Sequence, residues 1–354
     1  MTGASSPLPA WPLDPALAAL GLGPAAKIRR GMQILATAPR PPVALTASEV
    51  VFSQGRVDLR YYAPRRVRHA PVVLVPSLIN RAFILDLEPG RSLVEALSAA
   101  GYPTYLVDWG VPTIADCGQG LDEVVGMLRR SIDRASRHAR APRAHLLGYC
   151  MGGTIATLLA ARFPERVASL VALNAPARFS AGGRFADFVR QLDVDAAFDA
   201  EGLVPVETMK PAFQMLDPVG NVSKYLGIEA ASHEPAKLAR VLVRERWLEE
   251  NVPLPGAFAR DFIRDGYQRD ALLHRRWIVH GRVAVVQDIR APALVVACKK
   301  DFITPPAAAL PLAEAIPGAR AATLDVGHIG VVVGTEGPRQ FYPLLDQFWS
   351  GVEA

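Results

Sequence analysis

The sequence predicts an α/β fold in which a mainly parallel, doubly wound sheet carries an inserted, mainly helical cap. In two parts of the chain, residues 49–173 and 293–349, short apolar strands alternate with segments of helical periodicity. Such alternation is typical of a parallel sheet covered by helices. Between these parts lie about a hundred residues without that regularity, too many for a loop in a compact domain. We therefore interpret this stretch as a cap.

The order of the elements supports this fold class. Strands are expected at 49–52, 57–62, 71–75, 104–108, 168–173, 293–297 and 321–324, and helices near 92–99, 121–139, 307–315 and 339–349. In the helix at 121–139, apolar residues recur every three or four positions, and charged residues occupy the opposite face. Two further short helices are expected near 16–20 and 25–36, within the first 45 residues.

The most informative segment is His145–Thr154, with the sequence HLLGYCMGGT. An apolar strand leads there into a tight turn that is flanked by glycines, and a helix rich in Ala and Leu follows. This is the pattern of a nucleophile elbow, G-x-S-x-G, with Cys150 in the position of the serine. Gly148 and Gly152 would let the strand and the helix approach closely. The pattern indicates an α/β-hydrolase fold, and the thiol favours acyl transfer from a thioester over simple hydrolysis.

Two later loops supply partners for the nucleophile. Asp301 follows the strand at 293–297 and His328 follows the next strand, which gives the chain order nucleophile, acid, histidine that this fold uses. We expect His328 to take the proton of the Cys150 thiol and Asp301 to hold the tautomer of the imidazole. For the elbow motif alone, a buried structural cysteine is the alternative. The surrounding strand, turn and helix, with both partner loops, argue against it.

An oxyanion hole is expected beside the nucleophile. One donor is the backbone N–H of Met151, at the start of the elbow helix. The second is expected in the loop 75–81, from a backbone N–H near Leu78 or Ile79, or from the side-chain amide of Asn80. The alternative for Asn80 is a turn residue that stabilises the loop.

Composition narrows the classes of partner. The chain has 354 residues, of which 50% are hydrophobic and 21% charged, and this fits one large domain with an insertion or two small domains. The net charge of +5 comes from scattered arginines without a nucleic-acid signature, so we expect a solvated basic surface and no nucleic-acid partner. Attraction of an anionic CoA ester is the alternative explanation of the charge. No metal site is expected.

Three widely spaced cysteines argue against a disulfide framework and fit a reducing cytoplasm. Cys117 and Cys298 lack the context of an elbow and are interpreted as ordinary small residues. Prolines interrupt the first residues, so no signal peptide is expected, and no apolar stretch is long enough to form a transmembrane segment. The predicted organisation is an N-terminal arm at 1–45, a first core part at 46–177, a cap at 178–286 and a second core part at 287–354.

Several segments resemble the polyhydroxyalkanoate synthases. Residues 73–110, VLVPSLINRAFILDLEPGRSLVEALSAAGYPTYLVDWG, are similar to a family stretch in which a loop ends in Ile-Asn-Arg, ILDL follows, and the next strand ends in Asp-Trp-Gly. The boxes GYCMGG around Cys150, DFITPP around Asp301 and GHIGVVVG around His328 also match, as do RERW and FIRDGYQ in the cap. The resemblance covers roughly residues 70–350, with its motifs in order.

The resemblance implies a chemistry. The substrates would be (R)-3-hydroxyacyl-CoA thioesters, and the product a polyester formed with release of CoA. Cys150 would carry the growing acyl chain, His328 would activate it, and Asp301 would assist His328 or help to deprotonate the attacking 3-hydroxyl. No cofactor is implied, because CoA is part of the substrate. The apolar cap would exclude water, so that the hydroxyl of a second acyl unit wins the attack.

Only about 70 residues precede the core, which resembles the short, two-component classes (class III/IV-like) that need a second subunit. We therefore expect a second synthase subunit as partner, and a location in the cytoplasm at the surface of polyester granules. Two other interpretations stay open. The first is a capped thioesterase or intracellular polyester depolymerase with the same triad, in which water is the final acceptor. The second is a non-catalytic homologue that serves as a granule-binding or scaffold subunit.

Overall fold

The computed structural model describes residues 23–197, 201–216 and 218–353. The contacts within the chain divide it into two compact units. The smaller unit comprises residues 1–41 and 217–246, and the larger comprises residues 42–216 and 247–354. The insertion between the two parts of the core therefore contributes to both units. The predicted boundaries of the arm, the cap and the two core parts stay predictions.

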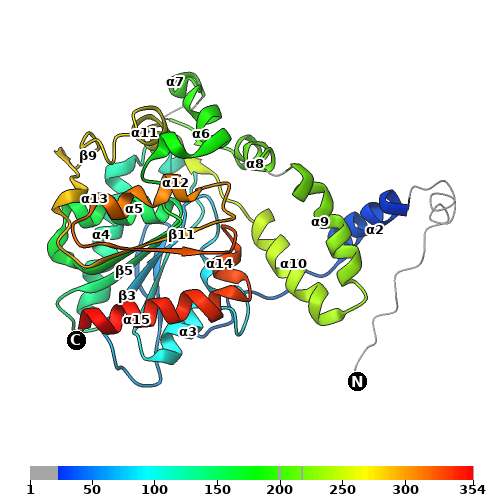
Figure 1. Ribbon diagram of the computed structural model, residues 1–354, viewed down its shortest axis with the longest axis horizontal. Coiled ribbons are helices and arrows are strands. Elements are labelled where there is room, and N and C mark those ends of the chain that lie inside the picture. The colour runs from blue at the N-terminus through cyan, green and yellow to red at the C-terminus, as the bar shows by residue number, and fades with distance from the viewer. Residues whose placement is uncertain (1–22, 198–200, 217, 354) are drawn as a thin grey trace. The chain divides into compact units, whose positions relative to one another are not determined.

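An eight-stranded sheet forms the centre of the larger unit (Figure 1). Its order is β1 (Glu49–Gln54), β2 (Val57–Tyr62), β4 (Thr104–Asp108), β3 (Val72–Val75), β5 (Ala144–Tyr149), β6 (Val167–Leu173), β11 (Ala293–Cys298) and β12 (Arg320–Leu324). From β4 to β12 all neighbouring strands are parallel, whereas β1 and β2 are antiparallel to their neighbours. The predicted mainly parallel sheet and its strands are confirmed.

The central strands are buried along their whole length. Every residue of β3, β5 and β11 is buried. Continuous apolar runs of this kind are typical of parallel strands covered on both faces. The carboxyl ends of β5, β11 and β12 lead into the turn and loops that hold Cys150, Asp301 and His328, and ligands of open α/β sheets bind at this edge.

Helices cover both faces of the sheet (Figure 1). α4 (Leu121–His138) and α5 (Met151–Arg162) lie on one face, while α3 (Leu93–Ala100) and α15 (Tyr342–Glu353) lie on the other. The segment at 307–315, expected as one helix, forms two, α12 (Pro306–Ala309) and α13 (Pro311–Ala315). The physical reason is Pro311, which has no N–H to donate and therefore starts a new helix. After the His328 loop, α14 (Gly330–Val333) is a single short turn of helix.

The insertion between β6 and β11 is mainly helical, as predicted. In the larger unit it contributes α6 (Gly183–Arg190), α7 (Val194–Ala197), α8 (Val206–Gln214) and α11 (Gly256–Phe262), with the short strands β7 (Leu203–Val204), β8 (Leu254–Pro255), β9 (Ile278–Val279) and β10 (Arg282–Val283). Aromatic side chains hold this part together. The ring of Phe179 lies 4.9 Å from that of Tyr267 and 5.7 Å from those of Phe262 and Trp277, between ring centroids.

The smaller unit is built from α2 (Gly23–Thr37), α9 (Pro218–Ala231) and most of α10 (Pro235–Glu249). α2 confirms the helix expected near 25–36, while the one expected near 16–20 lies outside the described residues. α2 and α9 pack so closely that a Cβ atom on Gly31 would lie 2.0 Å from the carbonyl oxygen of Tyr225. The buried carboxylate of Glu245 is paired with Lys224 and Arg244, at 3.2 Å from each.

Within the described ranges, no helix combines the length and the apolar character that a bilayer span requires.

Candidate active site

Cys150 lies on a sharp turn between β5 and α5. Its backbone has φ 56° and ψ −129°, a conformation that L-residues adopt rarely because it is strained. The turn is held by hydrogen bonds from the Cys150 N–H to the carbonyl of Leu173, at 2.9 Å, and from the Gly153 N–H to the Cys150 carbonyl, at 2.8 Å. This geometry matches the nucleophile elbow that the sequence predicts.

The glycines around Cys150 are required by close backbone approach. A Cβ atom on Gly148 would lie 2.5 Å from the carbonyl oxygen of Gly152, and one on Gly152 would lie 2.2 Å from that of Val75. The third glycine of the motif is equally constrained, because a Cβ atom on Gly153 would lie 2.5 Å from the Cβ of Ala175. The full G-x-C-x-G-G pattern therefore follows from packing at the start of α5.

Asp301 and His328 are hydrogen-bonded to one another. His328 Nδ1 lies 2.6 Å from Asp301 Oδ2, and both residues are buried. The other carboxylate oxygen of Asp301 accepts hydrogen bonds from the backbone N–H groups of Ile303 and Thr304, at 2.9 and 2.8 Å. The loop after β11 therefore orients the carboxylate, and the carboxylate orients the imidazole.

The pKa of His328 reflects two opposing influences. Burial alone would lower it, but the negative charge of Cys150, then that of Asp301, and hydrogen bonds with both residues raise the pKa to about 10. The structure thus brings together Cys150, His328 and Asp301. An imidazole with a raised pKa readily takes and holds a thiol proton, and the carboxylate behind it stabilises the resulting imidazolium.

The carbonyl oxygen of His328 is anchored by two side chains that the sequence pattern does not single out. The hydroxyl of Tyr149 donates to it at 3.0 Å, and the side-chain amide of Asn174 donates at 3.3 Å. Asn174 is fully buried at the end of β6 and has a φ of 47°. Both residues lie next to features that the sequence does reveal, because Tyr149 directly precedes Cys150 and Asn174 directly follows the core strand β6.

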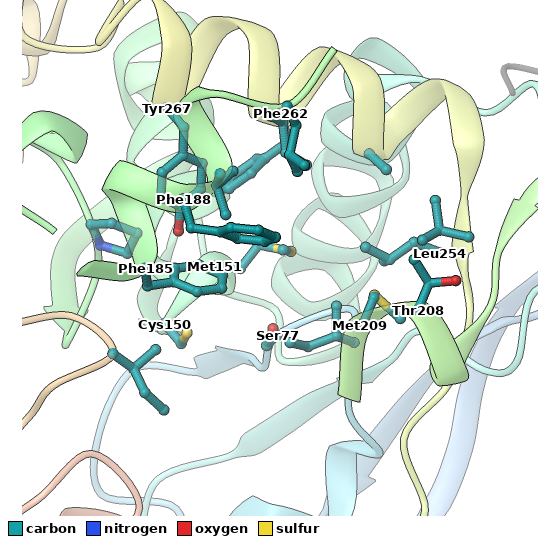
Figure 2. A pocket seen from close by; sticks show the side chains of 18 of the residues that line it. Ser77, Cys150, Met151, Phe185, Phe188, Thr208, Met209, Leu254, Phe262 and Tyr267 are labelled. Carbon is teal, nitrogen blue, oxygen red and sulfur yellow. The ribbon is translucent and has the colours of Figure 1, made fainter. Parts of the chain in front are cut away.

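Cys150 opens into a cavity of about 270 Å³, walled mainly by apolar side chains of the insertion (Figure 2). Its lining includes Phe185, Phe188, Met209, Leu254, Phe258 and Phe262. Tyr267 also lines the cavity and belongs to a π-helical segment at Ile263–Gln268. Short π-helical segments are frequent at functional sites. Burial, and then the charge of Cys150, raise the pKa of the Tyr267 hydroxyl, which therefore stays protonated.

The predicted oxyanion residues have different surroundings. Met151 is the first residue of α5, and both Met151 and Ile79 line the cavity. The carbonyl of Ile79 accepts a hydrogen bond from the N–H of Val252 at 3.1 Å, and the Asn80 side-chain amide donates to that of Asn251. The Asn80 amide thus joins its loop to the segment at 251–252. The oxyanion roles of Met151, Ile79 and Asn80 stay predictions.

Two family models match the chain. One, described as the alpha/beta hydrolase fold, covers residues 70–335, and the other, the N-terminus of poly-beta-hydroxybutyrate polymerase (PhaC), covers residues 41–97. Among solved structures, the enol-lactonase from Burkholderia xenovorans LB400 is similar, with a TM-score of 0.51 and 21% identity over 83% of this chain and 97% of that chain. At that identity the likeness shows the fold alone. The predicted α/β-hydrolase fold is confirmed.

Proteins that are similar in sequence identify the family more narrowly than the solved structures do. A poly(3-hydroxyalkanoate) polymerase subunit PhaC from Synechocystis is 30% identical over 322 residues, which is 87% of this chain and 85% of the relative. The chain belongs to the PhaC family. A PhaC subunit from Haloferax mediterranei is 30% identical over 318 residues, but the chain spans only 64% of the length of that relative. The family membership expected from the motifs around Cys150, Asp301 and His328 is thereby confirmed.

Proposed function

We propose that the protein is an acyltransferase that polymerises (R)-3-hydroxyacyl-CoA into poly(3-hydroxyalkanoate), with release of CoA. The observation that carries the proposal is the placement of a thiol, rather than a hydroxyl, at the elbow beside an apolar cavity. Cys150 there adjoins His328, which is hydrogen-bonded to Asp301. Membership of the PhaC family supports the substrate class, because the relatives are named poly(3-hydroxyalkanoate) polymerase subunits.

Acylation of Cys150 is the first half of the proposed reaction. His328 takes the thiol proton, and the thiolate attacks the carbonyl carbon of the CoA thioester. The tetrahedral intermediate then collapses, the bond to the CoA sulfur breaks, and CoA leaves as a thiol with the proton from His328. A thioester is exchanged for a thioester, so this step is close to thermoneutral and reversible.

Chain growth is the second half. The 3-hydroxyl of another (R)-3-hydroxyacyl-CoA attacks the thioester on Cys150, and His328, supported by Asp301, accepts the hydroxyl proton. As the tetrahedral intermediate collapses, the bond from the carbonyl carbon to the Cys150 sulfur breaks, and that sulfur takes the proton from His328. The lengthened chain is then a CoA thioester, which can acylate Cys150 again with release of CoA. Water competes for the thioester on Cys150. The apolar walls of the cavity, with Phe185, Phe188 and Phe262 among them, disfavour water and favour an acyl chain. This proposal needs no cofactor, because CoA arrives with the substrate.

The same proposal includes a partner subunit and a place of action in the cell. The relatives are named as subunits, which supports a second synthase subunit as partner of this chain. The polyester product is insoluble, so the protein would act in the cytoplasm at the granule surface. We expect that the chain isolated after expression alone polymerises far more slowly than the complex isolated from its own cells. Equal rates per chain would contradict the need for a partner.

The experiment that tests the function supplies (R)-3-hydroxybutyryl-CoA and measures both CoA and polyester. Wild-type protein is expected to release CoA and to form polymer, whereas Cys150→Ala forms neither. Cys150→Ser separates the chemistry of sulfur from that of a generic esterase. We expect its rate of polymer formation to fall by at least about 100-fold, because an alcohol is a much weaker nucleophile than a thiolate at neutral pH. CoA release that yields only free 3-hydroxybutyrate would favour the hydrolase alternative.

A further inference from the structure

The cavity that Cys150 lines also contains a buried serine hydroxyl for which the described residues provide no hydrogen-bond partner. Ser77 is 4% exposed and lines the same cavity as Cys150. Its Oγ atom is buried and has no hydrogen-bond partner among the residues that the structure describes. Leaving a buried hydroxyl unpaired is unfavourable, so each such group in a native protein calls for an explanation, such as a catalytic role or a bound water or ligand.

The chain around Ser77 fixes it next to the start of α5. A Cβ atom on Gly152 would lie 2.2 Å from the carbonyl oxygen of Val75 and 2.5 Å from that of Pro76, so these carbonyls lie against the first turn of the helix. The Pro76 carbonyl also accepts a hydrogen bond from the indole N–H of Trp109 at 2.9 Å, which pins the loop. Ser77 therefore follows two residues that are tightly held beside Gly152.

Figure 2 shows Ser77 along the same side of the cavity as Cys150, between Cys150 and Met209. Met151 and Gly152 are the first two residues of α5, where backbone N–H groups lack partners within the helix and carry the positive end of its dipole. Two kinds of hydrogen-bond donor therefore face the space over Cys150, where a substrate carbonyl would bind. They are the N–H of Met151 and the hydroxyl of Ser77. The Asn80 side chain does not compete for this role, because its amide donates to Asn251.

We propose that the Ser77 hydroxyl is a catalytic donor of the oxyanion hole, together with the backbone N–H of Met151. The inference rests on the proposed acyl transfer and adds a reacting-atom contact to it. When the Cys150 sulfur bonds to the thioester carbon, the π electron pair of the carbonyl moves to its oxygen, and Ser77 Oγ–H donates to that oxyanion. On collapse the pair returns, the bond to the CoA sulfur breaks, and the His328 proton goes to that sulfur.

The unpaired state of Ser77 at rest is what makes such a donor effective. A group that is unsatisfied before the reaction and paired in the transition state stabilises the transition state selectively, and therefore raises kcat more than it lowers KM. The same reasoning predicts a separation of stability and activity. Removing the hydroxyl removes an unsatisfied buried group, so folding should not suffer while catalysis does.

The test compares Ser77→Ala with wild type and with Ser131→Ala, a matched loss of a buried serine hydroxyl from α4, where Ser131 donates to the Met127 carbonyl and does not line the cavity. Single-turnover acylation of Cys150 by (R)-3-hydroxybutyryl-CoA is followed by mass spectrometry of the intact protein. Ser77→Ala is expected to acylate roughly 10- to 1000-fold more slowly, as for the loss of one oxyanion donor, with KM changed less than about twofold. Ser131→Ala should acylate within about threefold of wild type, because the lost hydroxyl donates within α4 and does not contact the reacting atoms.

Two further measurements separate catalysis from structure. Alkylation of Cys150 by iodoacetamide forms no oxyanion, so Ser77→Ala should react at the wild-type rate, and its melting temperature should equal or exceed that of wild type. Slowed alkylation, a lowered melting temperature or insoluble protein would assign Ser77 a structural role and overturn the proposal. Acylation at the wild-type rate would overturn it as well.

Acylation by p-nitrophenyl butyrate keeps this inference distinct from the proposed function, because that ester passes through the same oxyanion without CoA or polymer. If wild type makes no polymer but Ser77→Ala still slows this acylation, the polymerase proposal fails and the role of Ser77 stands. If polymer forms and Ser77→Ala has no effect with either substrate, only the inference fails.

Discussion

The hydroxyl of Tyr149 donates a hydrogen bond to the carbonyl oxygen of His328 at 3.0 Å, so the residue before Cys150 holds the loop that carries His328. Their two rings also lie 5.1 Å apart, between centroids. Asn174 donates to the same oxygen from the end of β6. The position of His328 relative to Cys150 is therefore set by the sheet itself, through side chains at the ends of two adjacent strands.

Tyr149→Phe tests this anchoring. The variant removes one of two donors to the His328 carbonyl, so we expect a loss of about 1 kcal/mol in the free energy of unfolding. The rate of Cys150 acylation should fall several-fold, because even a small displacement of the residue that accepts the proton slows the reaction markedly. Tyr102→Phe is the control, since the Tyr102 hydroxyl donates to Asp346, remote from the site. It should lose similar stability and keep full activity.

The charge of Cys150 is predicted to hold a proton on His328. Among the influences that raise the pKa of His328 to about 10, the charge of Cys150 is the largest. Cys150→Ala removes it and leaves the opposing effect of burial, so the pKa of His328 should fall. Histidine side-chain NMR, recorded as a pH titration of both proteins, measures the change. An unchanged pKa would mean that Asp301 alone is responsible.

Stability should depend on pH through the same residue. The pKa of His328 in the folded protein, about 10, lies above its ordinary value of 6.5, so the folded state binds this proton more tightly than the unfolded state. The contribution is full below about pH 6.5 and is lost as the pH rises through about 10. In urea titrations, the stability advantage of wild type over His328→Gln should therefore shrink across this range. An advantage that grows with pH would contradict the sign.

The sequence predicts the core well, because two kinds of local signal agree. Continuous apolar runs mark buried parallel strands, as in β3 and β5, and the glycines around Cys150 mark a place where backbones must touch. The loops that follow β11 and β12 can likewise be found from strand order, and these loops hold Asp301 and His328. Each of these signals lies within a few neighbouring residues.

Ser77 and the packing of the smaller unit could not be predicted in the same way. A serine in a loop is ordinary, and only the burial of Ser77 Oγ without a partner in the described part of the chain makes it informative. The contact of α2 with α9 joins segments about 190 residues apart, and no local pattern encodes such a contact. The same holds for Asn80, whose partner Asn251 lies 171 residues further along the chain, within the insertion.

Gly152→Ala should strongly destabilise the fold around the active site. The added Cβ would lie 2.2 and 2.5 Å from the carbonyl oxygens of Val75 and Pro76, and neither backbone segment can move freely because both are buried. We expect a loss of roughly 3 kcal/mol or more in the free energy of unfolding, in the range of large core disruptions. Gly118→Ala is the control, because its Cβ would meet nothing within 4 Å. It should change stability by less than about 0.5 kcal/mol.

Gly31→Ala and Gly227→Ala should change stability in opposite directions, although both place alanine in a helix of the smaller unit. On α2, a Cβ at position 31 would lie 2.0 Å from the Tyr225 carbonyl oxygen, so the variant must push α2 and α9 apart. On α9, a Cβ at position 227 would meet nothing within 4 Å, and alanine is a better helix former than glycine by about 1 kcal/mol. Hydrogen exchange of the α2 and α9 amides measures the local effect. Faster exchange in Gly31→Ala and slower exchange in Gly227→Ala are expected, and equal protection in both variants would show that the two helices do not depend on their contact.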